Sequence, residues 1–175
     1  LANNNIYVIT EESHGFILLG SDGNGLNYWS YDKKHIGKVP GSEKLQRIHS
    51  IVEENDSTLW IATDGQGAFR CTYHIRNGAP VMTDVASPEF CEPFNEWADH
   101  FSAAIRNDST IWFGSRQNGV LEYNSKSGKS RVIQFPTSSG LAVNETFYIT
   151  SADKMLFATG NGLVIYSPEA RSFHQ

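Results

Sequence analysis

The chain has 175 residues, a formal net charge of −5 and a pI near 5.6. Its basic residues are scattered, so we expect no nucleic acid partner, because phosphates need clustered Lys and Arg. The composition, 39% hydrophobic and 19% charged, is that of a folded globular protein, and the absence of an apolar run of about 18 residues predicts no membrane contact by this segment.

In chain order, four segments repeat one pattern: a short apolar run, a small residue, a polar turn with glycine, and a second apolar run. The segments cover 16–29, 59–70, 111–123 and 156–166. A period of this length is typical of stacked repeat units. We expect neighbouring sheets to approach closely at the small residues, which are spaced by 42, 52 and 44 positions. These small residues are Gly20, Ala62, Gly114 and Ala158.

Strands are expected on both sides of each small residue. Extended runs at 6–10, 48–53, 101–106 and 147–150 open the four units. The sequence Asn-Asp-Ser-Thr at 55–58 recurs at 107–110 and predicts hairpin turns, because such side chains bond their own backbone. The strands predicted for the two central units are 48–54, 58–63, 67–74 and 79–84, then 101–106, 110–115, 119–124 and 130–135.

The second strands are apolar at successive positions, as in the segment LWIA at 59–62, so both of their faces must be buried. Since no helical periodicity is present, other sheets must cover them. We therefore predict an all-β fold, a β-propeller of four-stranded antiparallel blades. Four blades lie in this chain, at 1–44, 45–98, 99–143 and 144–175. Trp60 and Trp112 are expected between blades, and Trp29 either in the core or on the surface.

Two cysteines, Cys71 and Cys91, lie 20 positions apart without metal-site spacing. Two states stay open for them: a disulfide in an oxidising compartment, or a pair of buried thiols. We expect no cofactor and no metal site.

The segments LWIATDGQGAFR at 59–70 and IWFGSRQNGVLEYNSKSGKSRVIQF at 111–135 resemble the propeller repeats of bacterial two-component regulators. The resemblance covers essentially the whole chain, although the first unit has Ile17-Leu18 in place of Leu-Trp and the fourth has a shorter turn. It implies the periplasmic sensor region of a hybrid histidine kinase, in a family that often detects glycan fragments. It also implies that this chain is part of a larger propeller.

The expected ligand face carries the turns between second and third strands and the links between blades. The longest spacing places an insertion near 87–97, and loops on a rigid scaffold often carry binding groups. Trp97 can stack on a sugar ring while Asn95 and Glu96 bond its hydroxyls. Alternatively, Phe90, Phe94 and Trp97 pack the insertion onto its blade. Turn residues complete the candidate ligand-binding set: Asp64, Gln66, Arg116, Gln117 and Asn118.

Arg116 stands where the first two units carry Asp22 and Asp64. It suits a carboxylate on an acidic sugar or partner, unless it is simply a solvated turn residue.

The function expected from these features is ligand sensing by a bacterial two-component sensor, with an oligosaccharide as ligand and a histidine kinase as the output. We expect no catalysis by this segment, because its six histidines are not paired with a nucleophile in the sequence. The alternative is a non-catalytic scaffold for protein contacts or dimerisation. Because the flanks of the end blades would otherwise be exposed, we expect either self-association or closure of the four blades into a compact ring.

Overall fold

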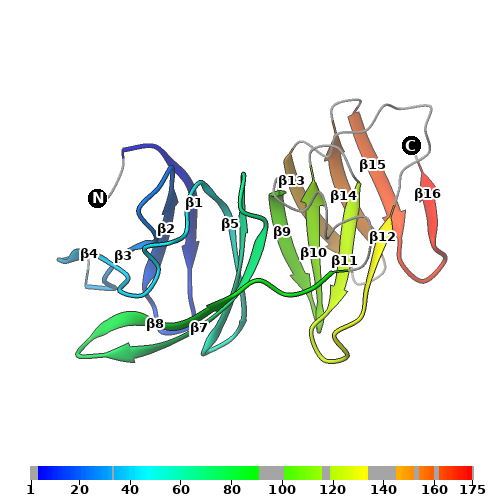
Figure 1. The fold of residues 1–175 in the computed structure, drawn as a ribbon. Coiled ribbons are helices and arrows are strands. Elements are labelled where there is room, and N and C mark those ends of the chain that lie inside the picture. Colours follow the sequence, from blue (N-terminus) through cyan, green and yellow to red (C-terminus); the bar gives the residue numbers. More distant parts are fainter. Residues whose placement is uncertain are drawn as a thin grey trace. The chain divides into compact units, whose positions relative to one another are not determined.

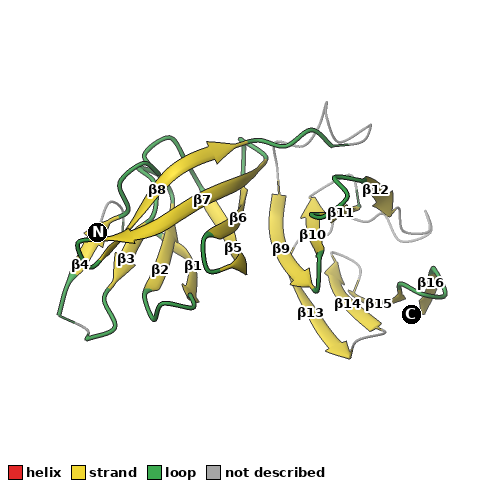
Figure 2. Ribbon diagram, turned by 90° about the horizontal axis from the view of Figure 1, so that it is seen from below, coloured by secondary structure: helices red, strands yellow, loops and turns green. Residues whose placement is uncertain are grey.

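A computed structural model describes residues 4–32, 34–90, 101–115, 119–133, 145–151, 154–159 and 162–174. Every regular element within these ranges is a β-strand (Figures 1 and 2). Consistent with this, the described residues contain no helix long and apolar enough to cross a membrane.

The strands form four antiparallel sheets, each made of four consecutive strands in chain order, as expected for propeller blades. The first blade contains β1 (Ile6–Glu11), β2 (Ile17–Ser21), β3 (Asn27–Trp29) and β4 (Ile36–Lys38). The second contains β5 (Ile48–Asn55), β6 (Thr58–Thr63), β7 (Ala68–Arg76) and β8 (Ala79–Ala86).

The third blade contains β9 (Phe101–Asn107), β10 (Thr110–Ser115), β11 (Val120–Asn124) and β12 (Ser130–Ile133). The fourth contains β13 (Glu145–Ser151), β14 (Lys154–Thr159), β15 (Gly162–Ser167) and β16 (Ser172–His174). The chain divides into two compact units, residues 1–88 with blades 1 and 2, and residues 89–175 with blades 3 and 4.

The prediction of an all-β propeller with four-stranded antiparallel blades is confirmed, and the predicted strands of the two central blades agree with the structure within two residues. β7 and β8 each end two residues later than predicted. Their turn, Asn77-Gly78, has positive φ at both residues, as a two-residue type I′ turn requires. An Asn-Gly pair between two extended runs is a local signal for such a hairpin.

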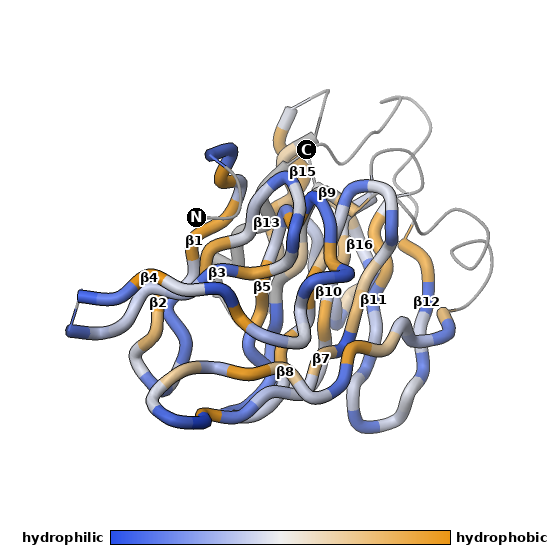
Figure 3. The backbone as a smooth tube through the Cα atoms, turned by 60° about the vertical axis from the view of Figure 1, so that its left-hand side comes forward, coloured by the Kyte–Doolittle hydropathy of each residue, from blue (hydrophilic) through white to orange (hydrophobic). Residues whose placement is uncertain are grey.

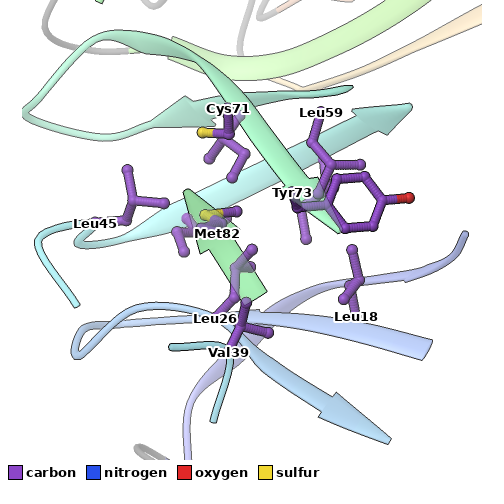
Figure 4. Packing of buried hydrophobic residues seen from close by; sticks show 11 residues of the cluster. Leu18, Leu26, Val39, Leu45, Leu59, Cys71, Tyr73 and Met82 are labelled. Carbon is purple, nitrogen blue, oxygen red and sulfur yellow. The ribbon is translucent and has the colours of Figure 1, made fainter. Parts of the chain in front are cut away.

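In the first unit, the core lies between the facing sides of blades 1 and 2. Figure 4 shows Leu18 and Leu26 of blade 1 directed toward Leu59, Tyr73 and Met82 of blade 2. All five side chains are buried. Along the chain, apolar residues concentrate in strands, while several connecting turns are hydrophilic (Figure 3).

Gly20 shows why a small residue is needed at this point of the repeat. A Cβ on Gly20 would lie 2.6 Å from Cγ2 of Ile48 in the next blade. This confirms the expected close approach of two sheets at that residue.

The second unit has its own core. Trp112 and Val120 of blade 3 pack with Met155, Phe157 and Tyr166 of blade 4. Both Trp60 and Trp112 are buried, as predicted. Trp29 is partly buried, so it lies neither fully in the core nor fully on the surface.

Candidate functional site

Most of the predicted ligand-binding residues lie outside the described residues. Asn95, Glu96 and Trp97 belong to the undescribed segment 91–100, and Arg116, Gln117 and Asn118 belong to 116–118. Their role stays a prediction. Asp64 and Gln66 are described, and they lie together in the β6–β7 turn of blade 2.

Gln66 fastens this turn to the link between blades 1 and 2. Its side-chain Oε1 accepts a hydrogen bond of 2.6 Å from the backbone N–H of Gln46. Its Nε2 donates to the carbonyl oxygen of Lys44 at 3.1 Å. Both ends of the amide are thus bound to main-chain groups, and the β6–β7 turn and the link form one connected surface. A sugar hydroxyl that bonds Gln66 would share the amide with these main-chain groups.

Asp64 is joined to the same link through Arg47. The backbone N–H of Asp64 donates to the Arg47 carbonyl at 3.0 Å, and its buried carboxylate lies 3.8 Å from the Arg47 guanidinium. A Cβ on Gly65 would lie 2.8 Å from Nη2 of Arg47, so the guanidinium covers this glycine. Gly65 has φ +109°, a conformation that favours glycine.

Arg47 is a candidate that the sequence reading missed. Its backbone has φ +41°, which is uncommon for a residue other than glycine, and half of its side chain is exposed. Arg47 comes directly after the predicted link 40–46. Its position next to that link is the feature of the sequence that could have identified it as a candidate. The described part of the expected ligand face therefore offers solvent a guanidinium held beside a carboxylate, an arrangement that suits polar, hydroxyl-rich or anionic groups.

The start of the insertion is fixed to blade 3. Phe90 is buried, with ring centroids 6.3 Å from Phe101, 5.8 Å from Phe113 and 5.6 Å from Tyr123. This agrees with the packing alternative for Phe90 itself. Phe94 and Trp97 lie outside the described residues.

A second polar cluster lies at the other end of the strands, where the β1–β2 turn of blade 1 meets blade 2. The carboxylate of Glu12 is buried and accepts hydrogen bonds from Tyr73 Oη at 2.7 Å and from the Phe16 N–H at 2.8 Å. Nδ1 of His14 lies 2.8 Å from the same carboxylate. The Glu53 carboxylate accepts from both the N–H and the hydroxyl of Ser13, at 3.0 and 2.5 Å.

The protonation states of this cluster follow from its burial and hydrogen bonds. Burial by itself raises the pKa of Glu12, but the hydrogen bonds from Tyr73, Phe16 and His14 outweigh it, so the pKa of this carboxyl lies below its usual value. Burial, and then the Glu12 carboxylate, raise the pKa of Tyr73 above its usual value. The cluster therefore holds an ionised carboxylate against a neutral phenol at neutral pH.

The cluster does not have the geometry of a serine hydrolase. The Ser13 hydroxyl donates to Glu53, whereas His14 is held by Glu12, and a nucleophile needs its base within hydrogen-bond reach. Among the described residues, no group of three or more His, Cys, Asp or Glu side chains could hold a metal ion.

Cys71 is a buried free thiol in the core of the first unit, and Cys91 lies outside the described residues. Burial raises the pKa of Cys71 to about 12. A thiol with so little thiolate at neutral pH is chemically inert.

No protein-family model and no curated protein sequence matches the chain. Several solved structures are similar to the chain. The extracellular domain of the putative hybrid two component system BT4673 from B. thetaiotaomicron is similar with a TM-score of 0.73 and 22% identity, over 97% of this chain and 22% of that one. The extracellular domain of BT3049, a putative hybrid two component system from the same organism, is similar with a TM-score of 0.72 and 14% identity. The match covers 99% of this chain and 24% of that one.

Virginiamycin B lyase from Staphylococcus aureus is similar with a TM-score of 0.67 and 18% identity, over 99% of this chain and 56% of that one. The chain thus spans about a quarter of the two extracellular domains and about half of the lyase. At these identities the similarity shows a shared fold.

Proposed function

We propose that the chain is a non-catalytic, ligand-sensing segment of a bacterial two-component sensor, that it works in the periplasm, recognises a carbohydrate and signals to a histidine kinase. One observation carries the proposal: 97% of the chain superposes on the extracellular domain of a putative hybrid two component system. The repeat sequences at 59–70 and 111–135 point to the same kind of protein independently of the superposition.

The proposed binding groups of the insertion are Trp97, Asn95 and Glu96. In the first unit, Arg47 beside the β6–β7 turn is a separate candidate contact. The described part of the expected ligand face supports the proposal in one respect. Gln66 and Asp64 bind the link and the turn together, so a ligand would meet groups that need little reordering, which reduces the entropy cost of binding.

Signalling requires that the ligand bind two arrangements of the receptor with different affinity. A ligand that contacts links between blades is well placed for this, because those links connect rigid sheets. In the proposed mechanism the ligand shifts the population of propeller orientations, and the kinase reads that shift.

The test is a thermal-shift and calorimetry screen of the chain against an oligosaccharide panel of neutral and acidic sugars. A ligand at 100 times its dissociation constant should stabilise the chain by about 2.7 kcal/mol. Trp97→Ala should abolish the shift, whereas Tyr31→Ala, which removes an exposed aromatic ring from blade 1, should leave it unchanged. No shift with any sugar, or equal loss with both variants, would contradict a sugar site at the insertion.

The second candidate is a scaffold that associates through its flanks. It is favoured by the apolar side chains exposed on blade 1, which include Ile9, Tyr31 and Ile36. Sedimentation equilibrium over a range of concentrations tests it. A monomer at all concentrations would contradict self-association.

A further inference from the structure

Two Asn-Gly pairs lie in described turns of the first unit, and their backbones are nearly alike. Asn24-Gly25 belongs to the β2–β3 turn of blade 1, and Asn77-Gly78 forms the β7–β8 turn of blade 2 (Figure 1). The φ angles are +63° and +79° at the first pair, and +51° and +76° at the second. Both asparagines are exposed. The dipeptide and its φ angles therefore give no reason for the two pairs to differ in chemistry.

An Asn-Gly pair can modify itself by a reaction that needs only water and hydroxide. Once its proton is removed, the backbone nitrogen of the glycine attacks Cγ of the asparagine side chain. The new N–Cγ bond closes a five-membered succinimide ring, and the bond from Cγ to the amide nitrogen breaks and releases ammonia. Water then opens either carbonyl of the ring and leaves aspartate or isoaspartate. Glycine favours the attack because it has no Cβ to obstruct the approach.

In blade 1 the nitrogen of the glycine is held by the link between the blades. The N–H of Gly25 donates to the carbonyl oxygen of the buried Leu45 at 3.0 Å, and Gly25 itself is buried. A Cβ on Gly25 would lie 2.6 Å from the carbonyl oxygen of Ser42. The next N–H, that of Leu26, donates to Oγ of Ser42 at 2.9 Å. Attack by the Gly25 nitrogen therefore requires local opening of the turn and the link.

In blade 2 the nitrogen of the glycine is accessible. Gly78 is exposed, and a Cβ built on it would meet nothing within 4 Å. Among the described residues, its N–H has no hydrogen-bond partner. The last pair of the β7–β8 ladder is Arg76–Ala79, so both turn residues lie outside the ladder. The Gly78 nitrogen can therefore approach Cγ of Asn77 while the sheet stays paired.

We propose that Asn77 is a site of spontaneous deamidation in the folded protein, with the Gly78 nitrogen as nucleophile and water as co-reactant. Asn24 is protected by the hydrogen bond from Gly25 to Leu45. The product adds one negative charge at the tip of the hairpin, and its isoaspartate form lengthens the backbone there by one carbon. This inference is independent of the proposed sensing function, because it uses no candidate ligand-binding residue.

The effect of the modification is confined to the end of the hairpin. An isoaspartate does not preserve the type I′ turn, because an extra carbon separates the two turn residues, so the terminal pair Arg76–Ala79 loosens first. The pair Tyr73–Met82 belongs to the same ladder, and both of its residues are buried in the core of the first unit. The fold is therefore kept, while the end of the hairpin gains mobility.

The experiment incubates the full chain in mildly alkaline buffer, once folded and once unfolded in urea. The buffer is made with heavy-oxygen water, which labels the acids that form during the incubation, and peptide mass analysis follows the labelled product at each asparagine. In the folded chain Asn77 should convert at least about tenfold faster than Asn24, because reaction at Asn24 requires local opening. In urea the two rates should become similar, since both pairs are then unprotected.

Asn77→Gln is the matched control, because its longer side chain would have to close a six-membered ring. The labelled product at position 77 should disappear, while the rate at Asn24 stays unchanged. Hydrogen exchange of the aged natural chain should become faster at the end of the hairpin and stay slow at Tyr73. Similar rates at the two asparagines of the folded chain would overturn the proposal, whether both are slow or both are fast, and so would faster conversion at Asn24.

Discussion

Trp60 in blade 2 and Trp112 in blade 3 occupy the same position of the repeat, and both are buried, yet their indole N–H groups differ in partner. Nε1 of Trp60 donates to Glu54 at 2.8 Å, and the Glu54 carboxylate also lies 3.6 Å from Arg70. Nε1 of Trp112 has no acceptor among the described residues.

The difference comes from one inserted residue. In β5 the pairing with β6 shifts between Glu53 and Asn55, so Glu54 is the extra residue of a β-bulge. In β9 the corresponding pairs with β10, through Arg106 and Asn107, follow without a shift. A bulge redirects a side chain, and in blade 2 it provides the acceptor for the buried indole. The repeat therefore determines where the ring is packed, while a one-residue irregularity determines whether its N–H is satisfied.

The largest effect is expected from removing either ring. Trp60→Ala and Trp112→Ala should each lower the free energy of unfolding by about 3–5 kcal/mol, because each leaves a large cavity in a packed core. Urea denaturation followed by hydrogen exchange in each unit measures this. A loss below about 1 kcal/mol at either site would show that the ring does not pack as described.

Replacing each ring by phenylalanine sharpens the comparison, because the volume change is then the same at both sites. Trp60→Phe should cost about 1.5–3 kcal/mol more than Trp112→Phe, since it removes a hydrogen bond to a charged group, whereas Trp112→Phe removes a donor without an acceptor among the described residues. Equal costs in urea denaturation would mean that Trp112 Nε1 is bonded in solution, for example to water.

Acid should destabilise the first unit, which contains Glu12. The pKa of Glu12 is lowered in the folded state, so its contribution to stability is present above the ordinary carboxyl pKa of about 4.3 and is lost as the pH falls through the lower folded value. Hydrogen exchange at falling pH should show the first unit weakening, and Glu12→Gln should flatten this dependence. Tyr73→Phe is the control that removes one donor and keeps the carboxylate. An unchanged pH profile in Glu12→Gln would contradict the prediction.

The smallest effect on stability is expected from breaking the ion pair between Arg70 and Glu54, the acceptor of the Trp60 indole N–H. Nearly half of the Arg70 side chain is exposed, and solvent screens such pairs. Arg70→Ala should change the free energy of unfolding by about 1 kcal/mol or less. A larger loss in urea denaturation would indicate that Arg70 positions Glu54 for the indole.

Much of the candidate site was beyond sequence reasoning, and Asp64 and Gln66 show why. Their place in the turn between the second and third strands followed from the repeat. Their partners Arg47, Lys44 and Gln46 lie on the link, 17 to 22 positions earlier in the chain, and nothing in the local pattern indicates that a glutamine amide bonds the main chain of that link. Turn chemistry is local, but contacts between a turn and a link depend on how two sheets stack.

The repeat period, the strands, the turns at 55–58 and 107–110 and the close approach of two sheets at Gly20 could all be predicted from the sequence. Strand alternation and turn propensity are local properties, so they can be read along the chain. Only the tertiary structure shows that Glu12 meets Tyr73, 61 positions away, and that Glu54 forms a bulge that gives the Trp60 indole its acceptor. These outcomes depend on how two sheets stack and on single-residue shifts in register, and neither is encoded in a periodic pattern.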